Sequence, residues 1–419
     1  MRVDRPSIIY WNNIPTPYVV GRFNSVATRG NLHFEAWFSE CREPDRSWAV
    51  VESDWAFPAR YICPKVVGGR TLHLPVAELN LTRPDLLVCL YGSPSFALGA
   101  LAARASGARV AFRALPTFET WVPRSRRREL SKRFLFRAVD GAKVPGPEGA
   151  AYAQRYGLPP DRLFSVTQTV DVEHYARAMT LRADERERRR EELGLTGTVF
   201  LYVGRLWKKK GLDDLFAAYS AARESHADMS LLVIGDGVDQ ERYRTQFMNL
   251  PGVHFVDFVQ PADLPFWYAL ADVLVLPTLG DPHGLVVEEA MAAGLPVICT
   301  EAAGDIRRRL PDGEAGFIVP PNCPSKLAER MLHLARDEEL RRRFGRFGHQ
   351  IVLDRNHDHY ARDFEAFVES VLSMPKRRTP ERWIAQSLGV AVNAALASTA
   401  PAPLIAPGSH HWQRIGWRG

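Results

Sequence analysis

Residues 201–211 read LYVGRLWKKKG, and this stretch predicts a buried strand that ends at Gly204, a basic turn, and a helix that begins near Leu212. Such a strand–turn–helix unit is typical of an open α/β sheet, whose ligands bind beyond the carboxyl ends of the strands. Arg205 stands at that end, and Lys210 stands just before the helix, whose free amide groups favour an anion. The planar guanidinium of an arginine and the compact charge of a lysine together suit a diphosphate. A basic loop that holds no ligand is the alternative.

The same alternation of short apolar runs and amphipathic stretches continues on both sides of this segment. Strands that are apolar throughout are buried on both faces, which is typical of a parallel sheet covered by helices. The first half is expected to contain strands at residues 7–11, 86–90, 108–112 and 142–144, with helices at 18–28, 95–105 and 125–139. The second half is expected to contain strands at residues 199–203, 230–234, 254–256, 273–276, 296–299 and 317–319. Two such series predict an α/β fold of two Rossmann-like, doubly wound parallel-sheet domains that face a cleft.

The chain of 419 residues is long enough for two such domains. We expect an N-terminal domain over residues 1–180 and a C-terminal domain over residues 195–355. The charged stretch 182–194 between them, RADERERRREELG, is interpreted as a solvated helix. A further helix over residues 356–374 is expected to pack back toward the N-terminal domain. Residues 375–419 mix basic, alanine-rich and proline-rich pieces, and we expect a loosely structured tail there.

The composition is that of a protein with sizeable apolar cores and a mildly basic surface. Hydrophobic residues make up 46% of the chain, and the net charge of +6 suits anionic ligands or an anionic membrane surface. Neither paired Cys/His spacing nor an aromatic RNA-binding strand motif occurs, so nucleic acid is not expected as a partner. The five cysteines are odd in number and lack CxxC spacing, which favours a reducing compartment. With neither an apolar leader nor a run of about 18 apolar residues, we expect a cytoplasmic protein without a membrane span.

A second informative segment, residues 279–296, reads LGDPHGLVVEEAMAAGLP. Gly284 allows a tight turn, and the helix expected to begin around residues 285–287 would present free amide groups to an anion. Asp281 precedes this turn, and Glu289 follows it within the helix. Carboxylates beside phosphates make sense if they accept hydrogen bonds from the hydroxyl groups of a sugar and of a ribose. A helix-capping aspartate and a helix-surface glutamate are the alternative interpretation.

Together these segments resemble a known family. The string from Asp281 to Pro296 resembles the E-x7-E signature of retaining glycosyltransferase family 4, and Gly204-Arg205-Leu206 with Lys210-Gly211 resembles the phosphate-binding pair of that family. The pieces LVIGDG at 232–237, VHFVDF at 253–258 and GEAGFIVP at 313–320 follow in the order of the family. The match lies within residues 197–350. It implies a GT-B fold in which the C-terminal domain binds a nucleotide sugar and the N-terminal domain binds the acceptor.

The resemblance also implies roles for four catalytic residues. Arg205 and Lys210 would neutralise the diphosphate of the donor. Asp281 would contact the donor sugar, and Glu289 would bond the ribose. One departure from the family concerns Asp281, which is one methylene shorter than the usual glutamate. Glu288 lies next to Glu289 and must point elsewhere on the helix.

Further residues are implied to bind the substrate without taking part in the chemistry. The backbone at residues 284–286 would cradle the distal phosphate, and residues 258–259 would line the base pocket. The implied residues in the C-terminal domain are Gly204, Asp236, Phe258, Val259, His283, Gly284, Leu285 and Val286.

We expect metal-independent transfer from a UDP- or GDP-linked sugar, with no cofactor. No DxD pair occurs near the strands of the C-terminal half, where Asp236 and Asp239 are three positions apart. The cations and helix amides would take the place of a metal in stabilising the departing diphosphate. The family retains the anomeric configuration. Since we identify no carboxylate nucleophile, we favour departure and return on one face of the sugar, in which the leaving phosphate accepts the proton of the acceptor.

The N-terminal domain is expected to bind the acceptor, for which the resemblance implies a glycan or a lipid-linked molecule in polysaccharide or glycolipid biosynthesis. The loop NIPTPY at residues 13–18 follows the first strand, and Pro17 within it is a candidate for the lip of the cleft. Arg113 and Glu119 are further candidates, with purely structural roles as the alternative. The stretch RSRRRELSKR at residues 124–133 is expected either to be a solvated helix or to dock peripherally on the inner face of an anionic membrane.

Other functions stay open at this point. Gly235-Asp236-Gly237 with Asp257 imitates the dinucleotide fingerprint of a nicotinamide-dependent oxidoreductase, but Gln240 occupies the third glycine position. A nucleotide-sugar epimerase and a glycoside phosphorylase are built on the same architecture. A sugar-nucleotide binder without catalysis is kept open by the altered Asp281.

Overall fold

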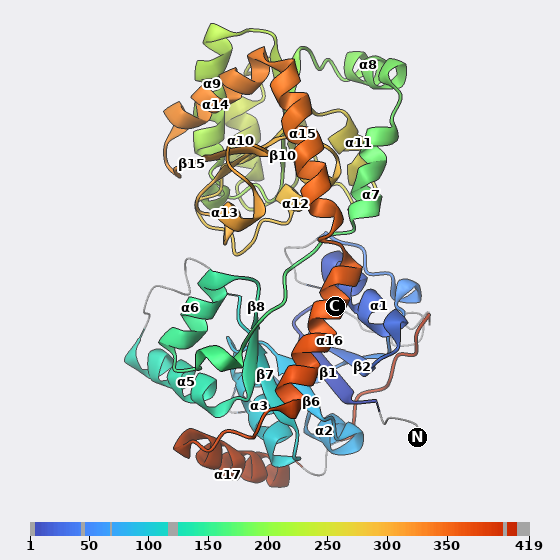
Figure 1. The fold of residues 1–419 in the computed structure, drawn as a ribbon, viewed down its shortest axis with the longest axis vertical. Coiled ribbons are helices and arrows are strands. Elements are labelled where there is room, and N and C mark those ends of the chain that lie inside the picture. Colours follow the sequence, from blue (N-terminus) through green and yellow to red (C-terminus); the bar gives the residue numbers. More distant parts are fainter. Residues whose placement is uncertain (1–4, 43–46, 68, 116–124, 397–399, 409–419) are drawn as a thin grey trace. The chain divides into compact units, whose positions relative to one another are not determined.

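The computed structural model describes residues 5–42, 47–67, 69–115, 125–396 and 400–408, and the chain divides into two compact units (Figure 1). The first unit takes in the described residues up to Thr167 together with those from His357 onward. The second unit spans Gln168–Asn356, so it begins earlier than the expected residue 195. Each unit is built around one parallel sheet, and the expected α/β class with two parallel-sheet domains is confirmed.

The first unit contains a seven-stranded parallel sheet in the order β3-β2-β1-β6-β7-β8-β9. Its strands are β1 Ser7–Asn12, β2 His33–Phe38, β3 Ala59–Tyr61, β6 Leu86–Cys89, β7 Arg109–Arg113, β8 Gly141–Val144 and β9 Leu163–Ser165, and β4 Pro64–Val67 pairs separately with β5 Arg70–His73. Its α-helices are α1 Pro17–Arg29, α2 Val76–Thr82, α3 Pro94–Ala105, α5 Arg126–Ala138, α6 Pro147–Arg155, α16 His357–Ser373 and α17 Pro380–Ala395. Because the strand order reverses between β1 and β6, ligands of this sheet are expected beyond the ends of those strands.

The second unit contains a six-stranded parallel sheet in the order β12-β11-β10-β13-β14-β15. Its strands are β10 Thr198–Val203, β11 Met229–Ile234, β12 Val253–Val256, β13 Val273–Leu276, β14 Val297–Thr300 and β15 Gly316–Val319. Its α-helices are α7 Val172–Ala176, α8 Ala183–Glu192, α9 Leu212–Ser225, α10 Gln240–Phe247, α11 Leu264–Ala269, α12 Val286–Ala292, α13 Ile306–Arg309, α14 Pro324–Arg336 and α15 Glu338–Leu353. Here the strand order reverses between β10 and β13, which is the order of a dinucleotide-binding sheet.

Every strand predicted from a continuous apolar run is present, with each end within one residue of its predicted position. Such runs mark strands that are covered on both faces, and β10 is buried at all 6 of its positions. The strands β2, β3, β4, β5 and β9 are missing from the prediction. In β2, His33 and Glu35 alternate with apolar residues, so the continuous run that marks the other strands does not occur.

Helix α16 packs on the sheet of the first unit beside α1 (Figure 1). The buried Lys143 of β8 donates to the Tyr360 hydroxyl at 2.9 Å, and its ammonium group lies 4.5 Å from the centre of that ring. Nearer the surface, Arg29 of α1 pairs with Asp358 and Glu365, each at 2.9 Å. These contacts make α16 part of the first unit, although it follows the second unit in the sequence.

The structure differs from the expected loosely structured tail over residues 375–419, because the described part of that stretch contains helix α17. This helix packs against α3. At Gly389 the two helices are so close that a Cβ atom would overlap the Leu101 carbonyl oxygen. Farther along, Ile405 forms a bridge with Ala59 of β3. The small residues of the alanine-rich stretch therefore serve close helix packing.

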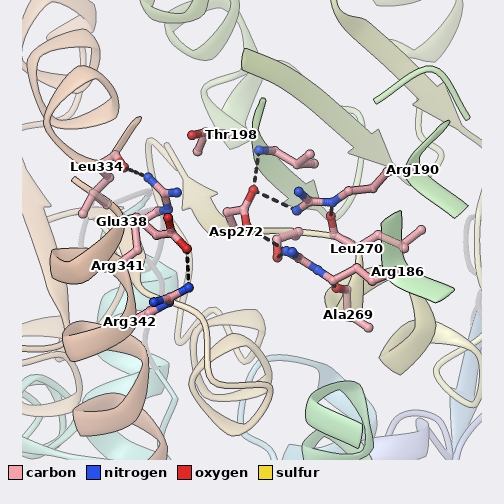
Figure 2. Close-up of polar contacts among 12 residues, drawn as sticks. Arg186, Arg190, Thr198, Ala269, Leu270, Asp272, Leu334, Glu338, Arg341 and Arg342 are labelled. Carbon is pink, nitrogen blue, oxygen red and sulfur yellow. Dashed lines mark hydrogen bonds and ion pairs between the residues drawn. The ribbon is translucent and has the colours of Figure 1, made fainter. Parts of the chain in front are cut away.

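The charged stretch 182–194 differs from the expected solvated helix, because one face of α8 is anchored to the second sheet. Figure 2 shows two of its arginines converging on Asp272, the residue directly before β13. Arg186 and Arg190 lie 2.7 and 2.8 Å from the two carboxylate oxygens of Asp272. The same carboxylate accepts the Val199 amide of β10 at 2.8 Å. This clamp makes α8 part of the second unit, although α8 precedes the expected start at residue 195.

Replacing Asp272 with asparagine is expected to lower the free energy of unfolding by about 2 kcal/mol at pH 7, because hydrogen bonds to charged groups are lost. Burial opposes ionisation of this carboxyl, but Arg190 and Arg186 outweigh burial, and the pKa of Asp272 is lowered. Such a carboxyl stabilises the fold above its unfolded pKa of about 3.9, and the contribution is lost as the pH falls through the folded value. Urea unfolding should therefore show a smaller difference between variant and wild type near pH 3 than at pH 7. Asp184→Asn, at an exposed α8 position paired with Arg182, is the matched control; an equal loss in both variants would contradict the clamp.

Candidate active site

Two loops of the second unit meet where the order of its sheet reverses. Strands β10 and β13 are neighbours, and the loop that follows β10 contacts the loop that follows β13. The Leu279 amide donates to the Lys209 carbonyl oxygen at 2.9 Å. Gly211, with φ of 73°, lies so close to the second loop that a Cβ atom would overlap the Pro277 carbonyl oxygen. Glycine is therefore required where the basic turn passes beside the loop after β13.

An ion pair between Lys210 and Asp281 joins the two loops, and the two side chains are 19% and 14% exposed. The second carboxylate oxygen of Asp281 accepts the His283 amide at 2.9 Å. Burial opposes ionisation of Asp281, but the charge of Lys210 and its hydrogen bond outweigh burial, and the pKa of the carboxyl is lowered. Lys210 and Asp281 are 71 positions apart in the sequence. The fold brings these two predicted residues together, both charged, at the carboxyl edge of the sheet.

Arg205 directly follows Gly204 at the end of β10, and a buried tyrosine of that strand holds its backbone. The Tyr202 hydroxyl donates to the Arg205 carbonyl oxygen at 2.8 Å. The Arg205 guanidinium lies 5.6 Å from the centre of the Trp207 ring. The pKa of Tyr202 is raised well above its ordinary value, first by burial and then by the charge of Asp281, while Arg205 acts in the opposite direction. Arg205 and Asp281 therefore both lie within electrostatic reach of this one hydroxyl group.

A buried ion pair supports the turn at Gly284. This glycine has φ of 71°, and a Cβ atom would lie 2.7 Å from the Leu276 side chain. Arg309 forms two hydrogen bonds of 2.6 Å with Glu288, and both side chains are at most 5% exposed. The same guanidinium donates to the carbonyl oxygens of His283 and Gly284, the latter at 3.0 Å. Arg309 thus holds the backbone that leads into α12, and Glu288 points toward it and away from the ligand edge.

Two of the predicted ligand-binding side chains are buried inside the second unit. Glu289 is 0% exposed, and its Oε2 atom accepts a hydrogen bond from Tyr268 at 2.8 Å. It is therefore not the surface glutamate of the alternative interpretation. His283 is 4% exposed, and its Nε2 atom lies 3.9 Å from the Glu288 carboxylate. In this conformation a ligand would meet His283 through its backbone.

The remaining predicted residues of the second unit stand directly after strands or at the start of α12. Asp236 follows β11, and its carbonyl oxygen accepts the Leu206 amide at 2.6 Å, which ties a third strand end to the basic turn. The others are Phe258 and Val259 after β12, which are half-buried, and Leu285 and Val286 at the start of α12.

Pro17 and Arg113, the predicted residues of the N-terminal half, lie at the carboxyl edge of the first sheet. Pro17 is the first residue of α1, and Thr16 caps that helix. Arg113 ends β7, and its Nη1 atom donates to Asn12 at the end of β1 over 3.2 Å. Glu119 lies outside the described residues.

Three side chains that position the site are missing from the prediction: Tyr202, Tyr268 and Arg309. A tyrosine within an otherwise apolar strand, as at 202, is a usable signal, since a buried hydroxyl group needs a partner. Arg309 gives no such signal. It ends a run of three arginines in which only the last is buried, and composition does not distinguish it from its neighbours.

Proteins of known family are similar to part of this chain. The family described as Glycosyl transferases group 1 matches residues 183–350. A D-inositol 3-phosphate glycosyltransferase of Corynebacterium glutamicum is 33% identical over 199 residues, which are 45% of this chain and 47% of the relative. A phosphatidyl-myo-inositol mannosyltransferase of Mycobacterium leprae is 35% identical over 159 residues, which are 37% of this chain and 42% of the relative. The chain spans about half the length of the curated relatives it matches.

Solved structures share the fold of this chain over most of its length. Anabaena HepE has a TM-score of 0.69 at 16% identity, over 87% of this chain and 100% of that one. A sucrose-phosphate synthase of Thermosynechococcus elongatus has a TM-score of 0.68 at 18% identity, over 88% of this chain and 100% of that one. A likeness at such low identity establishes the fold, and the family match covers both loops that meet at Lys210 and Asp281. The chain therefore has the GT-B fold, and its residues 183–350 match the family described as Glycosyl transferases group 1.

Proposed function

We propose that this chain is a retaining, metal-independent glycosyltransferase of family 4 that moves a sugar from a nucleotide-diphosphate sugar to a glycan or lipid-linked acceptor. A role in polysaccharide or glycolipid biosynthesis follows from this class of acceptor. The observation that carries the proposal is the pairing of Lys210 with Asp281 between the loops after β10 and β13. It places a cation and a hydrogen-bond acceptor together at the strand ends where sheets of this kind bind ligands.

Related proteins support the class of donor. Anabaena HepE was solved in complex with UDP and with UDP-glucose, and the curated relatives include a glycosyltransferase and a mannosyltransferase by name. For this chain we propose a UDP- or GDP-linked sugar. Phe258 and Val259 would line the pocket of the base, and Glu289 would bond the ribose.

In the proposed reaction the diphosphate competes with Asp281 for the ammonium group of Lys210. Lys210 and Arg205 would donate to the diphosphate, and the released carboxylate of Asp281 would accept a hydrogen bond from a hydroxyl group of the donor sugar. As the bond between the anomeric carbon and the phosphate oxygen breaks, negative charge grows on the diphosphate. The two cations stabilise this developing charge more than they stabilise the bound donor, and this difference lowers the barrier.

Transfer on one face of the sugar would retain the anomeric configuration without an enzymatic nucleophile. The leaving phosphate accepts the proton of the acceptor hydroxyl group, and the new bond forms on the face from which the phosphate departed. The positive potential that a metal supplies in other transferases would come from Arg205, Lys210 and the backbone amides at Gly284, Leu285 and Val286.

A thermal-shift panel of UDP- and GDP-sugars, followed by product analysis with glycan and lipid-linked acceptors, tests this function. We expect stabilisation by a UDP- or GDP-sugar and not by NAD, a rate that EDTA leaves unchanged, and a product with the anomeric configuration of the donor by NMR. A rate restored only by Mg²⁺ would contradict metal independence, and an inverted product would contradict one-face transfer. Binding without any product would favour the sugar-nucleotide binder, and an altered sugar nucleotide without transfer would indicate an epimerase.

We also propose that the protein works at the inner face of an anionic membrane, where lipid-linked acceptors reside. Helix α5 presents Arg126, Arg127 and Arg128 as exposed residues of its first turn, and anionic headgroups attract such clusters. No helix in the described part of the chain is long and apolar enough to cross a bilayer.

A further inference from the structure

Helix α17 exposes large apolar side chains along one face. Trp383 is 69% exposed, Ile384 52%, Leu388 47% and Val390 54%. Their spacing places them within one side of an α-helix. Residues 383–395 contain no charged side chain, so no charged group lies on this face over most of the helix. Several large exposed apolar side chains on one side of a helix indicate a surface that a membrane or another molecule covers.

The packing of α17 on its own unit does not require these large side chains. Its inner face includes small residues, of which Ala385 is fully buried and Gly389 touches the backbone of α3 at Leu101, and Val392 packs against the core of the unit. Asn393 of the same face donates to the Ala102 carbonyl oxygen at 3.3 Å. The helix is therefore held in place by residues other than Trp383, Ile384, Leu388 and Val390, which are exposed.

Basic residues are frequent on the elements next to α17. Helix α17 also packs against α5 (Figure 1), and residues 125–138 and 376–396 together contain ten basic and two acidic residues. Both acids are engaged within the unit, since Glu129 accepts a hydrogen bond from Tyr156 at 2.6 Å and Glu381 pairs with Arg137 at 3.0 Å. The exposed cations are Arg126, Arg127, Arg128, Arg133, Arg137, Lys376 and Arg378.

We propose that the outer face of α17 inserts into the interfacial region of an anionic bilayer, while the cations of α5 and of residues 376–378 contact the headgroups. Apolar residues beside lysine and arginine are the composition of helices that lie in the membrane plane. A second copy of this chain fits the face less well, because two such surfaces would bring their cations together. The proposal deepens the proposed function, since it assigns a surface to the membrane contact, but it does not depend on sugar transfer.

Sedimentation of the full chain with vesicles of phosphatidylcholine and phosphatidylglycerol tests this surface. The wild type should bind these vesicles, lose binding at high salt, and bind pure phosphatidylcholine weakly. The triple variant Trp383→Ser, Ile384→Ser, Leu388→Ser should lose binding by a factor of at least about 10, because most of the inserted apolar area is removed. The pair Arg127→Glu, Arg128→Glu should weaken binding to the anionic vesicles only.

A matched control removes three equally exposed apolar residues of the second unit: Val238→Ser, Met248→Ser and Leu353→Ser, whose residues are 72%, 60% and 48% exposed. This control should bind vesicles like the wild type. Equal binding by the α17 triple variant, or equal wild-type binding to neutral and anionic vesicles, would overturn the proposal. So would a dimer that the triple variant abolishes, seen by analytical ultracentrifugation without vesicle binding. The nucleotide sugar should stabilise the triple variant as it stabilises the wild type. A wild type that no nucleotide sugar stabilises would contradict the proposed function and not the membrane surface.

Discussion

Lys210→Ala is expected to lower turnover on the order of 10²-fold, the scale on which one preorganised electrostatic contact with developing charge is lost. The loss has two parts in this site. The diphosphate loses the attraction of the ammonium group. Asp281, whose pKa the same group holds down, is left facing the diphosphate without its partner, and repulsion is added. The rate should therefore fall much more than the stability of the fold, since the pair lies at the edge of the sheet and is partly exposed.

Steady-state kinetics with saturating acceptor would measure this effect, with Lys209→Ala as the matched control. Lys209 is the preceding residue, and its ammonium group lies 4.6 Å from the centre of the Trp207 ring. Its replacement is a surface change worth at most about 0.5 kcal/mol, or roughly twofold in rate. Equal losses of turnover in the two variants would show that the total positive charge of the turn matters and that Lys210 has no special role. In the double variant Lys210→Ala, Asp281→Asn, relief of repulsion should recover donor binding but not turnover.

The parallel sheets could be predicted from the sequence because their strands are covered on both faces. A strand such as β13, four buried apolar residues in a row, cannot be mistaken for a surface element. The loops after β10 and β13 could be predicted for a related reason: glycines, cations and carboxylates follow directly after such runs. Gly211 and Gly284 stand where the backbone makes close approaches, and both have positive φ. The meeting of Lys210 and Asp281 then follows from the neighbouring positions of the two strands.

Features that depend on partners distant in sequence could not be predicted in this way. The burial of Glu289 against Tyr268, and of Glu288 against Arg309, is decided by where α11 and α13 pack and not by local pattern. Helix α17 was not predicted from the sequence for another reason. Its largest apolar residues face outward and small residues such as Ala385 face inward, so its composition resembles that of a loosely held segment, although the helix approaches α3 closely at Gly389.

Glu288→Gln is expected to lower the free energy of unfolding of the second unit by about 3–5 kcal/mol, the cost of leaving one member of a buried ion pair unpaired. The Arg309 guanidinium would remain in the interior without its counter-charge, because it is 4% exposed and cannot turn to solvent within this fold. Urea unfolding at neutral pH would measure the loss. Glu301→Gln is the matched control, since Glu301 pairs with Arg307 at the surface, where the two side chains are 44% and 66% exposed. Exposed pairs contribute only about 0–1 kcal/mol, so equal losses in the two variants would refute the buried pair as the source.

A double variant separates the stabilising role of this pair from its role in the site. Glu288→Met with Arg309→Met replaces both charges by apolar side chains of similar length, and such replacements regain much of the stability of a buried pair. Activity should not return with stability. Arg309 also donates to the carbonyl oxygens of His283 and Gly284, and a methionine cannot hold the turn on which the distal phosphate is proposed to rest. A stable double variant with wild-type kcat/KM would show that Arg309 acts only on the fold. A stable variant with a raised KM for the donor and a lowered kcat would establish it as a positioning residue, because a purely structural role would leave both constants unchanged once stability is restored.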